Sequence, residues 1–377
     1  MLSQARAGYT RRGPMTTNES IAVLTSGGDA PGMNAAIRAI AKVAASRGVH
    51  VVGVENGYTG LREGRFRPLT QARAGAVVPA AGVDEIGSLG GTVLGSAREL
   101  RFVTAEGRAP AVEHMKQLRG LVVVGGNGSL AGAHALAQES STPVVGMPAS
   151  IDNDVGCSAS AIGVDTALNT IVAACDKICD TARAHRRAFV VEVMGRDCGY
   201  LAMAGAIAAG ADAVLFREQG RDEAAIVAAV EQAVRRGFAE GSAKQSVLIL
   251  KAEGVAMPST QLVRIVEERI AADLHGVDVR ATVLGHLVRG GNPSFQDRMI
   301  AGRLGLAAVQ AILTGTTDTM VAWQAAVPGG TPTEDSSVQR FALEHVLRES
   351  AALVDGTSPV TRRRIKLMEA VEGVLGL

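Results

Sequence analysis

Short apolar runs alternate with amphipathic helical patterns along most of this chain. Eight of these runs are bounded by glycine or polar residues and have the composition of buried strands. They cover residues 21–25, 49–54, 121–124, 144–147, 188–193, 213–216, 247–250 and 279–284. Helical patterns lie between them, at 32–46, 165–183, 222–236 and 259–274. Because alternating strands and helices build mainly parallel sheets covered by helices, the sequence predicts the α/β class.

The length of the chain predicts more than one folding unit. At 377 residues it exceeds a typical single domain, so we expect two lobes. No low-complexity linker and no internal repeat marks a boundary, which would allow the chain to cross between lobes more than once. The helix that begins near Asp165 is a candidate crossing point. Residues between Gly57 and Gly95 show little periodicity, and here we expect mostly loop with a short helix.

Charge and hydropathy exclude several classes of partner. The 38 lysines and arginines nearly balance the 37 acidic residues, which argues against nucleic acid or an anionic membrane as a partner held by bulk charge. No apolar run reaches the ~20 residues of a membrane helix. The N-terminal arginines precede no apolar core, so we expect a disordered tail over residues 1–18 rather than a secretory signal, and a cytoplasmic protein.

Two glycine-rich loops follow predicted strands and open predicted helices. The first runs from Gly27 to Asn34, and the second, from Gly125 to Ser129, follows the strand at 121–124. Glycines let backbone amides approach an anion, and a helix N-terminus adds free N–H groups and the positive end of its dipole. Neither loop is a Walker A or a G-x-G-x-x-G motif. Either alone could be an ordinary turn with a serine cap, but together they predict a cradle for a polyphosphate.

Asp152 and Asp154 come just after the apolar run 144–147 and Pro148. In open α/β sheets, ligands bind outside the carboxyl ends of the strands. The two carboxylates could therefore act as a proton acceptor and a metal ligand. The alternative is an Asx-rich turn, since Asp and Asn readily bond to their own backbone.

Basic residues collect near the ends of several predicted strands. Their guanidinium groups could bind a phosphate dianion, or they could be exposed salt-bridge partners. The set comprises Arg98, Arg183, His185, Arg186, Arg187, Arg196, Arg280, His286 and Arg289. Glu253, after the strand at 247–250, could accept a hydrogen bond from a sugar hydroxyl or begin a loop.

Taken in order, these motifs resemble the phosphofructokinase A family. The match runs from about residue 21 to beyond residue 297, and it rests on the segments 24–34, 151–154, 193–196 and 283–291. The resemblance implies two α/β lobes whose cleft transfers a phosphoryl group from ATP to the 1-hydroxyl of fructose 6-phosphate, with Mg²⁺. It places the nucleotide lobe at 19–163 plus about 289–338, and the sugar-phosphate lobe at 164–288 plus about 339–377.

The resemblance also implies residue roles. Asp152 would take the proton of the sugar hydroxyl, and Ser150 and Arg196 would complete the catalytic group. The nucleotide side would comprise Gly28, Tyr58, Arg98, Gly126, Asn127, Gly128 and Ser129. The sugar-phosphate side would comprise Ser150, Asp152, Arg187, Met194, Gly195, Arg196, Glu253, Arg280, His286 and Arg289. Asn127 and Asp154 would hold the metal. Arg187 and Arg280 match arginines that reach in from a neighbouring subunit, which implies a homotetramer, with a dimer as the minimum.

Departures from the family pattern qualify these roles. Pyrophosphate users in the family carry Asp at Gly128 and Lys at Ala149, so ATP is the expected donor. Ser150 replaces the usual Thr. Asn127 replaces the usual metal-associated Asp, so we expect weaker Mg²⁺ binding and slower turnover.

Changes at the family's effector site make its usual regulation doubtful. Arg38 and Lys42 keep their charge there, but Cys179 and Asp212 differ from the family. The alternatives are a pyrophosphate-dependent or mixed-donor enzyme, a kinase for a related sugar phosphate, or a weakly catalytic sugar-phosphate-binding regulator. A dehydrogenase is disfavoured, because the dinucleotide fingerprint is missing.

Overall fold

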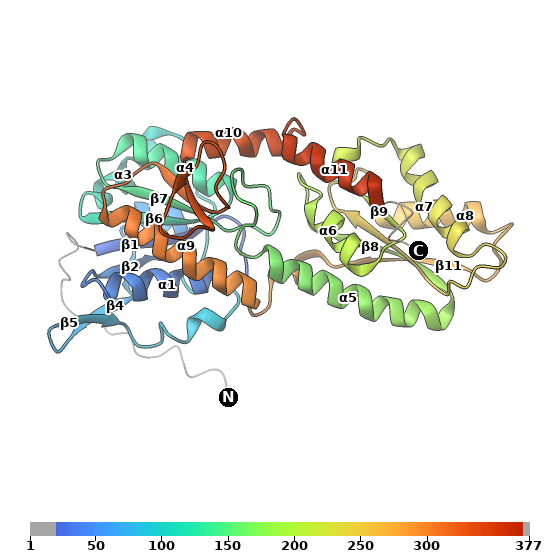
Figure 1. The fold of residues 1–377 in the computed structure, drawn as a ribbon, viewed down its shortest axis with the longest axis horizontal. Helices are drawn as coiled ribbons and strands as arrows, with labels where there is room; N and C mark the ends of the chain where they lie inside the picture. The colour runs from blue at the N-terminus through green and yellow to red at the C-terminus, as the bar shows by residue number, and fades with distance from the viewer. Residues whose placement is uncertain (1–19, 372–377) are drawn as a thin grey trace.

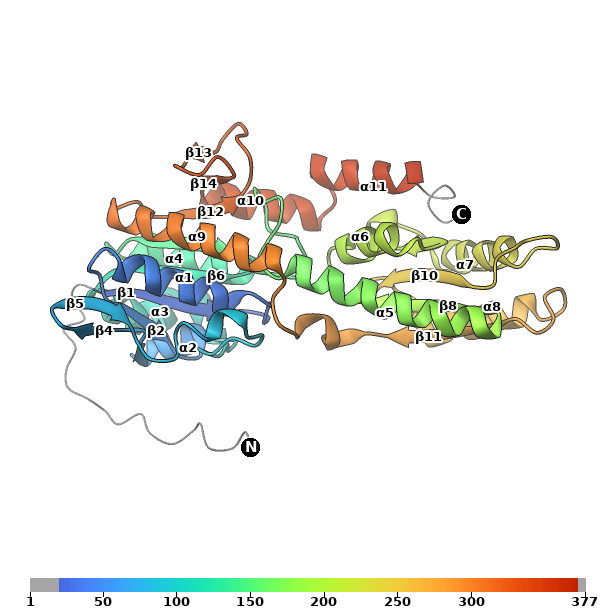
Figure 2. The same cartoon turned by 60° about the horizontal axis from the view of Figure 1, so that its bottom comes forward.

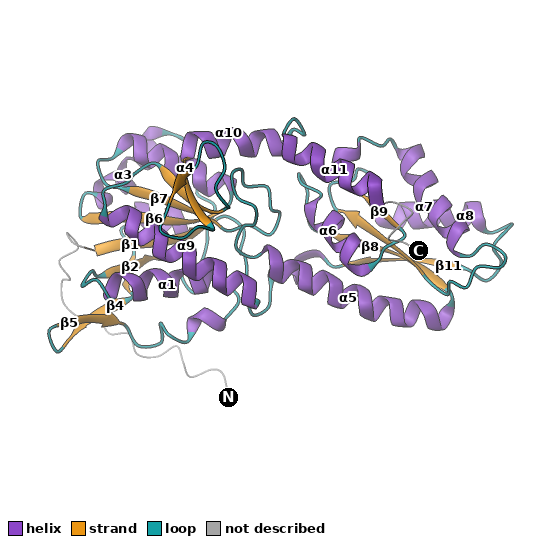
Figure 3. Cartoon of the chain, in the orientation of Figure 1, coloured by secondary structure: helices purple, strands orange, loops and turns teal. Residues whose placement is uncertain are grey.

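The computed structural model describes residues 20–371, which form two α/β lobes joined side by side (Figure 1). The predicted tail over 1–18 lies outside the described residues. Each lobe contains a mainly or wholly parallel sheet between helices, as the alternating pattern predicts (Figure 3). No helix within residues 20–371 is long and apolar enough to cross a membrane.

The larger lobe contains an eight-stranded sheet of order β13-β14-β12-β7-β6-β1-β2-β3. Its parallel centre is made of β1 (Ser20–Ser26), β2 (Val51–Val54), β6 (Leu118–Gly125), β7 (Val144–Pro148) and β12 (Thr319–Trp323). The edges are antiparallel and consist of β3 (Phe66–Pro68), β13 (Thr331–Pro332) and β14 (Val338–Ala342).

Both faces of the larger sheet are buried, because its strands are apolar on both sides. Ile21 and Val23 of β1 pack into a cluster with α1 (Met33–Ala45) and α9 (Phe295–Leu313). Ala22 and Leu24 point to the opposite face. That face is covered by α2 (Gly57–Arg62), α3 (Ala105–Met115), α4 (Asn127–Glu139) and α10 (Leu343–Val354).

The smaller lobe contains a wholly parallel four-stranded sheet, in the order β11 (Asp278–Val283), β8 (Arg187–Val193), β10 (Val247–Ala252) and β9 (Ala213–Leu215). One face is covered by α5 (Val164–His185) and α6 (Tyr200–Ala209). The other face is covered by α7 (Glu223–Gly237) and α8 (Ser259–Ile270).

The chain passes between the lobes three times within the described residues. The long helix α5 makes the first passage, as predicted for the helix near Asp165, and its N-terminal part contacts α9. The chain returns through the 3₁₀ helix η5 (Gly285–Arg289) into α9. It leaves again from α10 into α11 (Pro359–Val371), which lies beside the smaller lobe (Figure 2).

Two sequence-based expectations need correction. The segment from Gly57 to Gly95 is not mostly loop: besides α2 it contains β3 and a hairpin of β4 (Thr70–Arg73) and β5 (Ala76–Pro79). The expected lobe boundary near residue 338 is too early, because β14 pairs with β12 in the larger sheet and α10 packs on α4. Both errors come from short or amphipathic elements whose partners are distant in sequence.

Candidate active site

The two glycine loops leave the same edge of the larger sheet. Strands β1 and β6 are parallel neighbours, and Ser26 lies opposite Gly125 in their register. A Cβ atom on Gly125 would lie 2.5 Å from the Ser26 carbonyl oxygen and 2.6 Å from Ser129 Oγ. Only glycine permits this close approach. The backbone amides that follow both strands are therefore brought to one place, as the sequence predicts.

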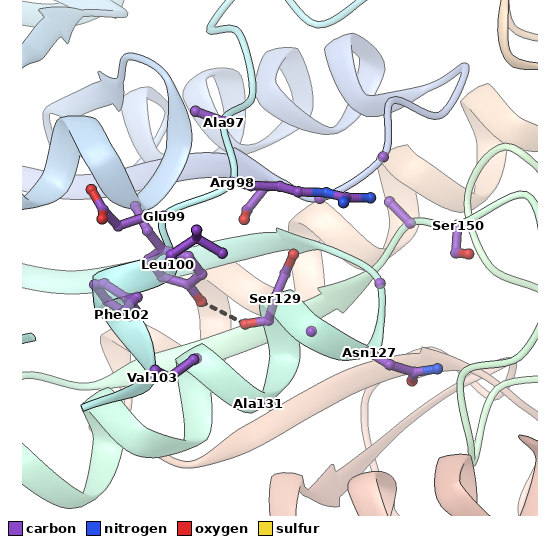
Figure 4. A pocket seen from close by; sticks show the side chains of 18 of the residues that line it. Ala97, Arg98, Glu99, Leu100, Phe102, Val103, Asn127, Ser129, Ala131 and Ser150 are labelled. Atoms are coloured by element: carbon purple, nitrogen blue, oxygen red, sulfur yellow. Dashed lines mark hydrogen bonds between the residues drawn. The ribbon is translucent and has the colours of Figure 1, made fainter. Parts of the chain in front are cut away.

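A cavity of about 780 Å³ opens at this edge. It is lined by all seven residues predicted for the nucleotide side: Gly28, Tyr58, Arg98, Gly126, Asn127, Gly128 and Ser129. The lining also includes Ser150, Asp152, Asp154 and Arg289. Figure 4 shows Arg98 extending across the cavity above Ser129, toward the side where Ser150 lies. The cavity thus joins the predicted phosphate cradle to the predicted catalytic loop.

One wall of this cavity escaped the sequence analysis. The 3₁₀ helix η3 (Leu100–Val103) places Leu100 and Val103 in the lining, with 82% and 79% of their surface exposed. Phe102 between them stacks on Tyr58, with ring centroids 4.1 Å apart. In the sequence, the only sign of this wall was the presence of the apolar residues Leu100, Phe102 and Val103 within a polar segment. Exposed apolar side chains beside the predicted phosphate cradle suit the base of a nucleotide.

Tyr58 fixes the start of α4 against the η3 wall. Its hydroxyl donates a hydrogen bond of 2.5 Å to the Ser129 carbonyl oxygen (Figure 4). Burial raises the pKa of Tyr58 far above its ordinary value, so the hydroxyl remains a donor. η3 is held in turn by an ion pair of 3.0 Å between Arg62 and Glu99, and by Arg108, which donates to the Phe102 carbonyl oxygen at 2.7 Å.

Asp152 and Asp154 lie in the loop after β7, as predicted. The loop does turn at Asn153, which has a φ of 50° and whose side chain bonds to the backbone of Ala159 and Ala161. Asn153 therefore holds the turn, while the two carboxylates line the cavity. The turn predicted for this motif is therefore present, and it places both carboxylates at the cavity.

Burial disfavours ionisation of both acids. It raises the pKa of Asp152 to about 6, with a further increase from the nearby charge of Asp154. The opposing influence is Arg289, whose Nη2 lies 4.0 Å from Asp152 Oδ2. Burial also raises the pKa of Asp154, which accepts a hydrogen bond of 3.3 Å from Ser150 Oγ. A pKa nearer to neutrality suits a group that must accept a proton.

Asn127 contacts Asp154 and leaves one oxygen available. Its Nδ2 donates to Asp154 Oδ2 at 3.0 Å and to the Asp154 carbonyl oxygen at 3.2 Å. Its Oδ1 is buried and has no hydrogen-bond partner among the described residues. An orphaned amide oxygen beside a carboxylate fits Mg²⁺, which takes one or two protein oxygens and completes its shell with phosphate and water. Residues 20–371 contain no group of three or more His, Cys, Asp or Glu that would hold a metal alone.

Residues predicted for the sugar-phosphate side follow the carboxyl ends of the smaller sheet. Met194, Gly195 and Arg196 follow β8, and Gly195 has a φ of 121°, which favours glycine. Glu253 follows β10 and donates its N–H to the Val193 carbonyl oxygen at 2.9 Å. His286 lies in η5 after β11. The parallel strands bring all three segments to one edge.

This second group of residues does not form part of the described cavity lining. Met194, Gly195, Arg196, Glu253 and His286 are not among the described lining residues, whereas Asp197 is, and the sequence analysis missed it. The charges of Glu253 and Asp197 are close enough to raise the pKa of Asp152. Charges from both lobes therefore act on the Asp152 carboxylate.

Arg187 and Arg280 lie away from this site in the single chain. Arg187 begins β8, six residues before Val193 at the carboxyl end, which at about 3.3 Å per residue is roughly 20 Å along the strand. Arg280 lies opposite Phe189 in the register. Both arginines pair with Asp278, at 3.2 and 3.0 Å. One chain alone does not bring these two residues to Asp152.

Comparisons with known proteins point to one family. A family model described as Phosphofructokinase matches residues 20–312. An ATP-dependent 6-phosphofructokinase of Thermotoga neapolitana is 45% identical over 308 residues, which cover 81% of this chain and 90% of that protein. The ATP-dependent 6-phosphofructokinase 2 of Bacteroides thetaiotaomicron is 44% identical, with 81% and 89% covered.

Solved structures show the same fold. Phosphofructokinase from Saccharomyces cerevisiae aligns with a TM-score of 0.76 and 29% identity over 94% of this chain and 50% of that chain. A pyrophosphate-dependent phosphofructokinase from Marinobacter aquaeolei aligns with a TM-score of 0.70 over 93% and 91% of the chains. At 18% identity, that second likeness concerns the fold alone.

Proposed function

The chain belongs to the phosphofructokinase family, and we propose that its cleft transfers the γ-phosphoryl group of ATP to the 1-hydroxyl of fructose 6-phosphate. The observation that carries this proposal is the shared cavity, in which two glycine loops and Asp152 meet. Relatives at 45% and 44% identity are named for the ATP-dependent reaction. The products are ADP and fructose 1,6-bisphosphate.

In the proposed step, the sugar hydroxyl oxygen attacks the γ-phosphorus while Asp152 accepts the hydroxyl proton. The bond from the γ-phosphorus to its bridging oxygen breaks, and ADP leaves with that oxygen. Charge on the transferring group must be stabilised by fixed donors rather than by covalent bonds. The backbone amides after β1 and β6 and the guanidinium groups of Arg98 and Arg289 line the cavity in which this charge would develop.

Mg²⁺ fits the pair Asn127 and Asp154, which would hold it through one amide oxygen and one carboxylate. When bound, Mg²⁺ neutralises charge on the phosphate oxygens. The protein itself holds these two side chains toward the end of the cavity where the phosphate groups of ATP would lie. Asn127 also bonds to Asp154 and so limits its motion.

The choice of ATP over pyrophosphate is supported by the shape of the cavity. A Cβ on Gly128 would meet nothing within 4 Å, so this glycine leaves open space. Beyond it the lining continues along α4 through Ala131, Gly132 and Ala135 to the apolar η3 wall. Pyrophosphate has no nucleoside to fill such a region, whereas ATP has one.

The position of the new phosphate tests the proposed reaction. We expect phosphorus NMR of the product to show one phosphate on each end of the sugar and stoichiometric ADP. A product phosphorylated elsewhere would indicate a kinase for a related sugar phosphate. Binding of the sugar phosphate without any product would instead favour the regulator.

Asn127→Asp should strengthen the metal site. We expect a several-fold lower Mg²⁺ requirement and a higher kcat, because a second carboxylate ligates Mg²⁺ better than an amide oxygen. Without metal the substitution removes the 3.0 Å bond to Asp154 and places like charges together. We expect the metal-free variant to lose about 1–3 kcal/mol of stability, and its Tm to recover with added Mg²⁺. Unchanged Mg²⁺ dependence, kcat and Tm would contradict the metal role of Asn127.

We propose that Arg187 and Arg280 act in the site of a neighbouring subunit, within a homotetramer. Their placement at the amino half of the smaller sheet supports this, since neither can reach Asp152 of its own chain.

Mixed oligomers test this arrangement. Arg280→Ala should raise the KM for fructose 6-phosphate without changing the KM for ATP. When Arg280→Ala and Asp152→Asn subunits are unfolded and refolded together, activity at a low concentration of fructose 6-phosphate should exceed that of either variant refolded alone, because an intact site then receives its arginine from the other variant. No gain over the separately refolded variants would show that Arg280 serves its own chain or none.

A further inference from the structure

The helix α11 lies beside the smaller lobe and begins near its junction with the larger lobe (Figures 1 and 2). It follows α10, which packs on α4 of the larger lobe, and it contacts α6 and the 3₁₀ helix η4 (Arg217–Gln219) of the smaller lobe. Its outer residues are mostly exposed, but Arg364 is half-buried and points inward.

The Arg364 guanidinium touches both lobes at once. Its Nη1 and Nη2 donate to the Asn153 carbonyl oxygen at 3.4 and 3.3 Å. Nη1 also lies 3.7 Å from Cys198 Sγ, and the guanidinium carbon is 4.4 Å from the centre of the Tyr200 ring. Asn153 belongs to the loop after β7, while Cys198 and Tyr200 follow β8 and lead into α6.

Asn153 is the residue between the two site carboxylates, and the structure holds it tightly. It has a φ of 50° and is 2% exposed. Its side chain accepts from the Ala161 N–H at 3.1 Å and donates to the Ala159 carbonyl oxygen at 3.2 Å. Its carbonyl belongs to the peptide plane that leads to Asp154. A rotation of that plane would move Asp154 and, through the left-handed turn, Asp152.

On the other lobe, the partners of Arg364 lie next to the sugar-phosphate loop. Cys198 is two residues after Arg196 and directly follows Asp197, which lines the cavity. A planar guanidinium can donate in several directions and stack on an aromatic ring at the same time, which an ammonium cannot do. One arginine therefore fixes the distance between the segments that carry Asp152 and Arg196.

We propose that Arg364 is a positioning residue for phosphoryl transfer, which holds the Asp152–Asp154 loop of the larger lobe in register with the Arg196–Tyr200 segment of the smaller lobe. The inference rests on the proposed function, because it assigns Arg364 an effect through Asp152. Reacting groups must be placed within a fraction of an ångström, and a misplacement of about 1 Å can lower the rate about 100-fold.

The expected signature is a loss of turnover without a loss of nucleotide binding. Arg364→Ala should lower kcat about 10- to 100-fold, while the KM for ATP and the stoichiometry of ADP binding stay within about twofold of wild type. The glycine loops that bind the nucleotide leave β1 and β6, and the contacts of Arg364 do not include them. Arg363→Ala is the matched control, because Arg363 is the preceding arginine of the same helix and is exposed.

A double-mutant cycle separates positioning from support of the fold. If Arg364 acts through Asp152, adding Arg364→Ala to Asp152→Asn should cost less than about twofold in kcat, because groups that act as a unit are not additive. A purely structural role would multiply the two losses and lower the ADP stoichiometry. Full additivity, or a kcat for Arg364→Ala equal to that of Arg363→Ala, would overturn the proposal.

Arg364→Lys is a more conservative substitution, which keeps the proposal testable if the alanine variant does not fold. Lysine keeps the charge over Tyr200 but lacks the planar guanidinium that donates to several acceptors. We therefore expect an intermediate kcat and the same lack of additivity with Asp152→Asn. A wild-type kcat in the lysine variant would overturn the role of the planar guanidinium. No turnover of fructose 6-phosphate with ATP by the wild type would instead overturn the proposed function, so the two failures are distinguishable.

Discussion

Asp152→Asn is expected to lower kcat by about 10³-fold, since a positioned general base contributes roughly 10²- to 10⁴-fold. Asparagine keeps the shape of the side chain but cannot accept the proton of the sugar hydroxyl. The KM for ATP should change little, because the substitution leaves untouched the glycine loops and the η3 wall, which we propose surround the nucleotide. Steady-state kinetics with fructose 6-phosphate and ATP measure both effects.

Stability provides the control for this variant. Burial and Asp154 raise the pKa of Asp152 to about 6. Ionisation of Asp152 therefore costs more free energy in the folded protein than in the unfolded chain. Above that pH the carboxylate lowers stability, and the neutral asparagine removes this cost. Without metal at pH 8, we therefore expect the Tm of Asp152→Asn to equal or exceed that of wild type. A loss of activity accompanied by a clearly lower Tm would contradict a catalytic role and indicate damage to the fold.

Gly128→Asp is expected to lower kcat/KM for ATP by about 100- to 1,000-fold. The new side chain has room, because a Cβ at this position meets nothing within 4 Å, so the fold should tolerate it. Its charge would enter the phosphate end of the cavity. Two like charges about 4 Å apart near a protein surface repel by about 4 kcal/mol, which is about three orders of magnitude in rate.

Gly302→Asp is the matched control, because it also replaces a helical glycine by a charged aspartate. Gly302 lies within α9, a Cβ there also meets nothing within 4 Å, and the residue is absent from the described cavity lining. This variant should keep the kcat/KM for ATP of the wild type. Unimpaired use of ATP by Gly128→Asp would mean that the nucleotide does not pass over α4, and the donor assignment would have to change.

The convergence of the two glycine loops could be predicted because it depends on local rules. Carboxyl ends of parallel strands meet at one sheet edge, so the loops after residues 24 and 124 had to converge once β1 and β6 were neighbours. The doublet Asp152 and Asp154 was located for the same reason. Asn127 was assigned to the site by resemblance, and its unpartnered oxygen is seen only in the structure.

Other parts of the site depend on contacts that no local pattern encodes. The η3 wall is placed by ion pairs such as Arg62 to Glu99, which join residues 37 positions apart. The contact of Arg364 with Asn153 spans 211 positions. The hairpin of β4 and β5 is largely exposed, so it lacks the apolar alternation that marks a strand. Arg187 and Arg280 were grouped with the site by resemblance, but the single chain keeps them apart from it.

The donor and the reaction are tested together by initial rates of phosphorylation of fructose 6-phosphate with ATP, GTP or pyrophosphate as donor, each with and without Mg²⁺. We expect Mg²⁺-dependent formation of fructose 1,6-bisphosphate with ATP, and a kcat/KM for pyrophosphate at least about 100-fold lower, since the nucleoside contacts of the cavity are then unused. Turnover with pyrophosphate alone, or no turnover with any donor, would contradict the proposed function.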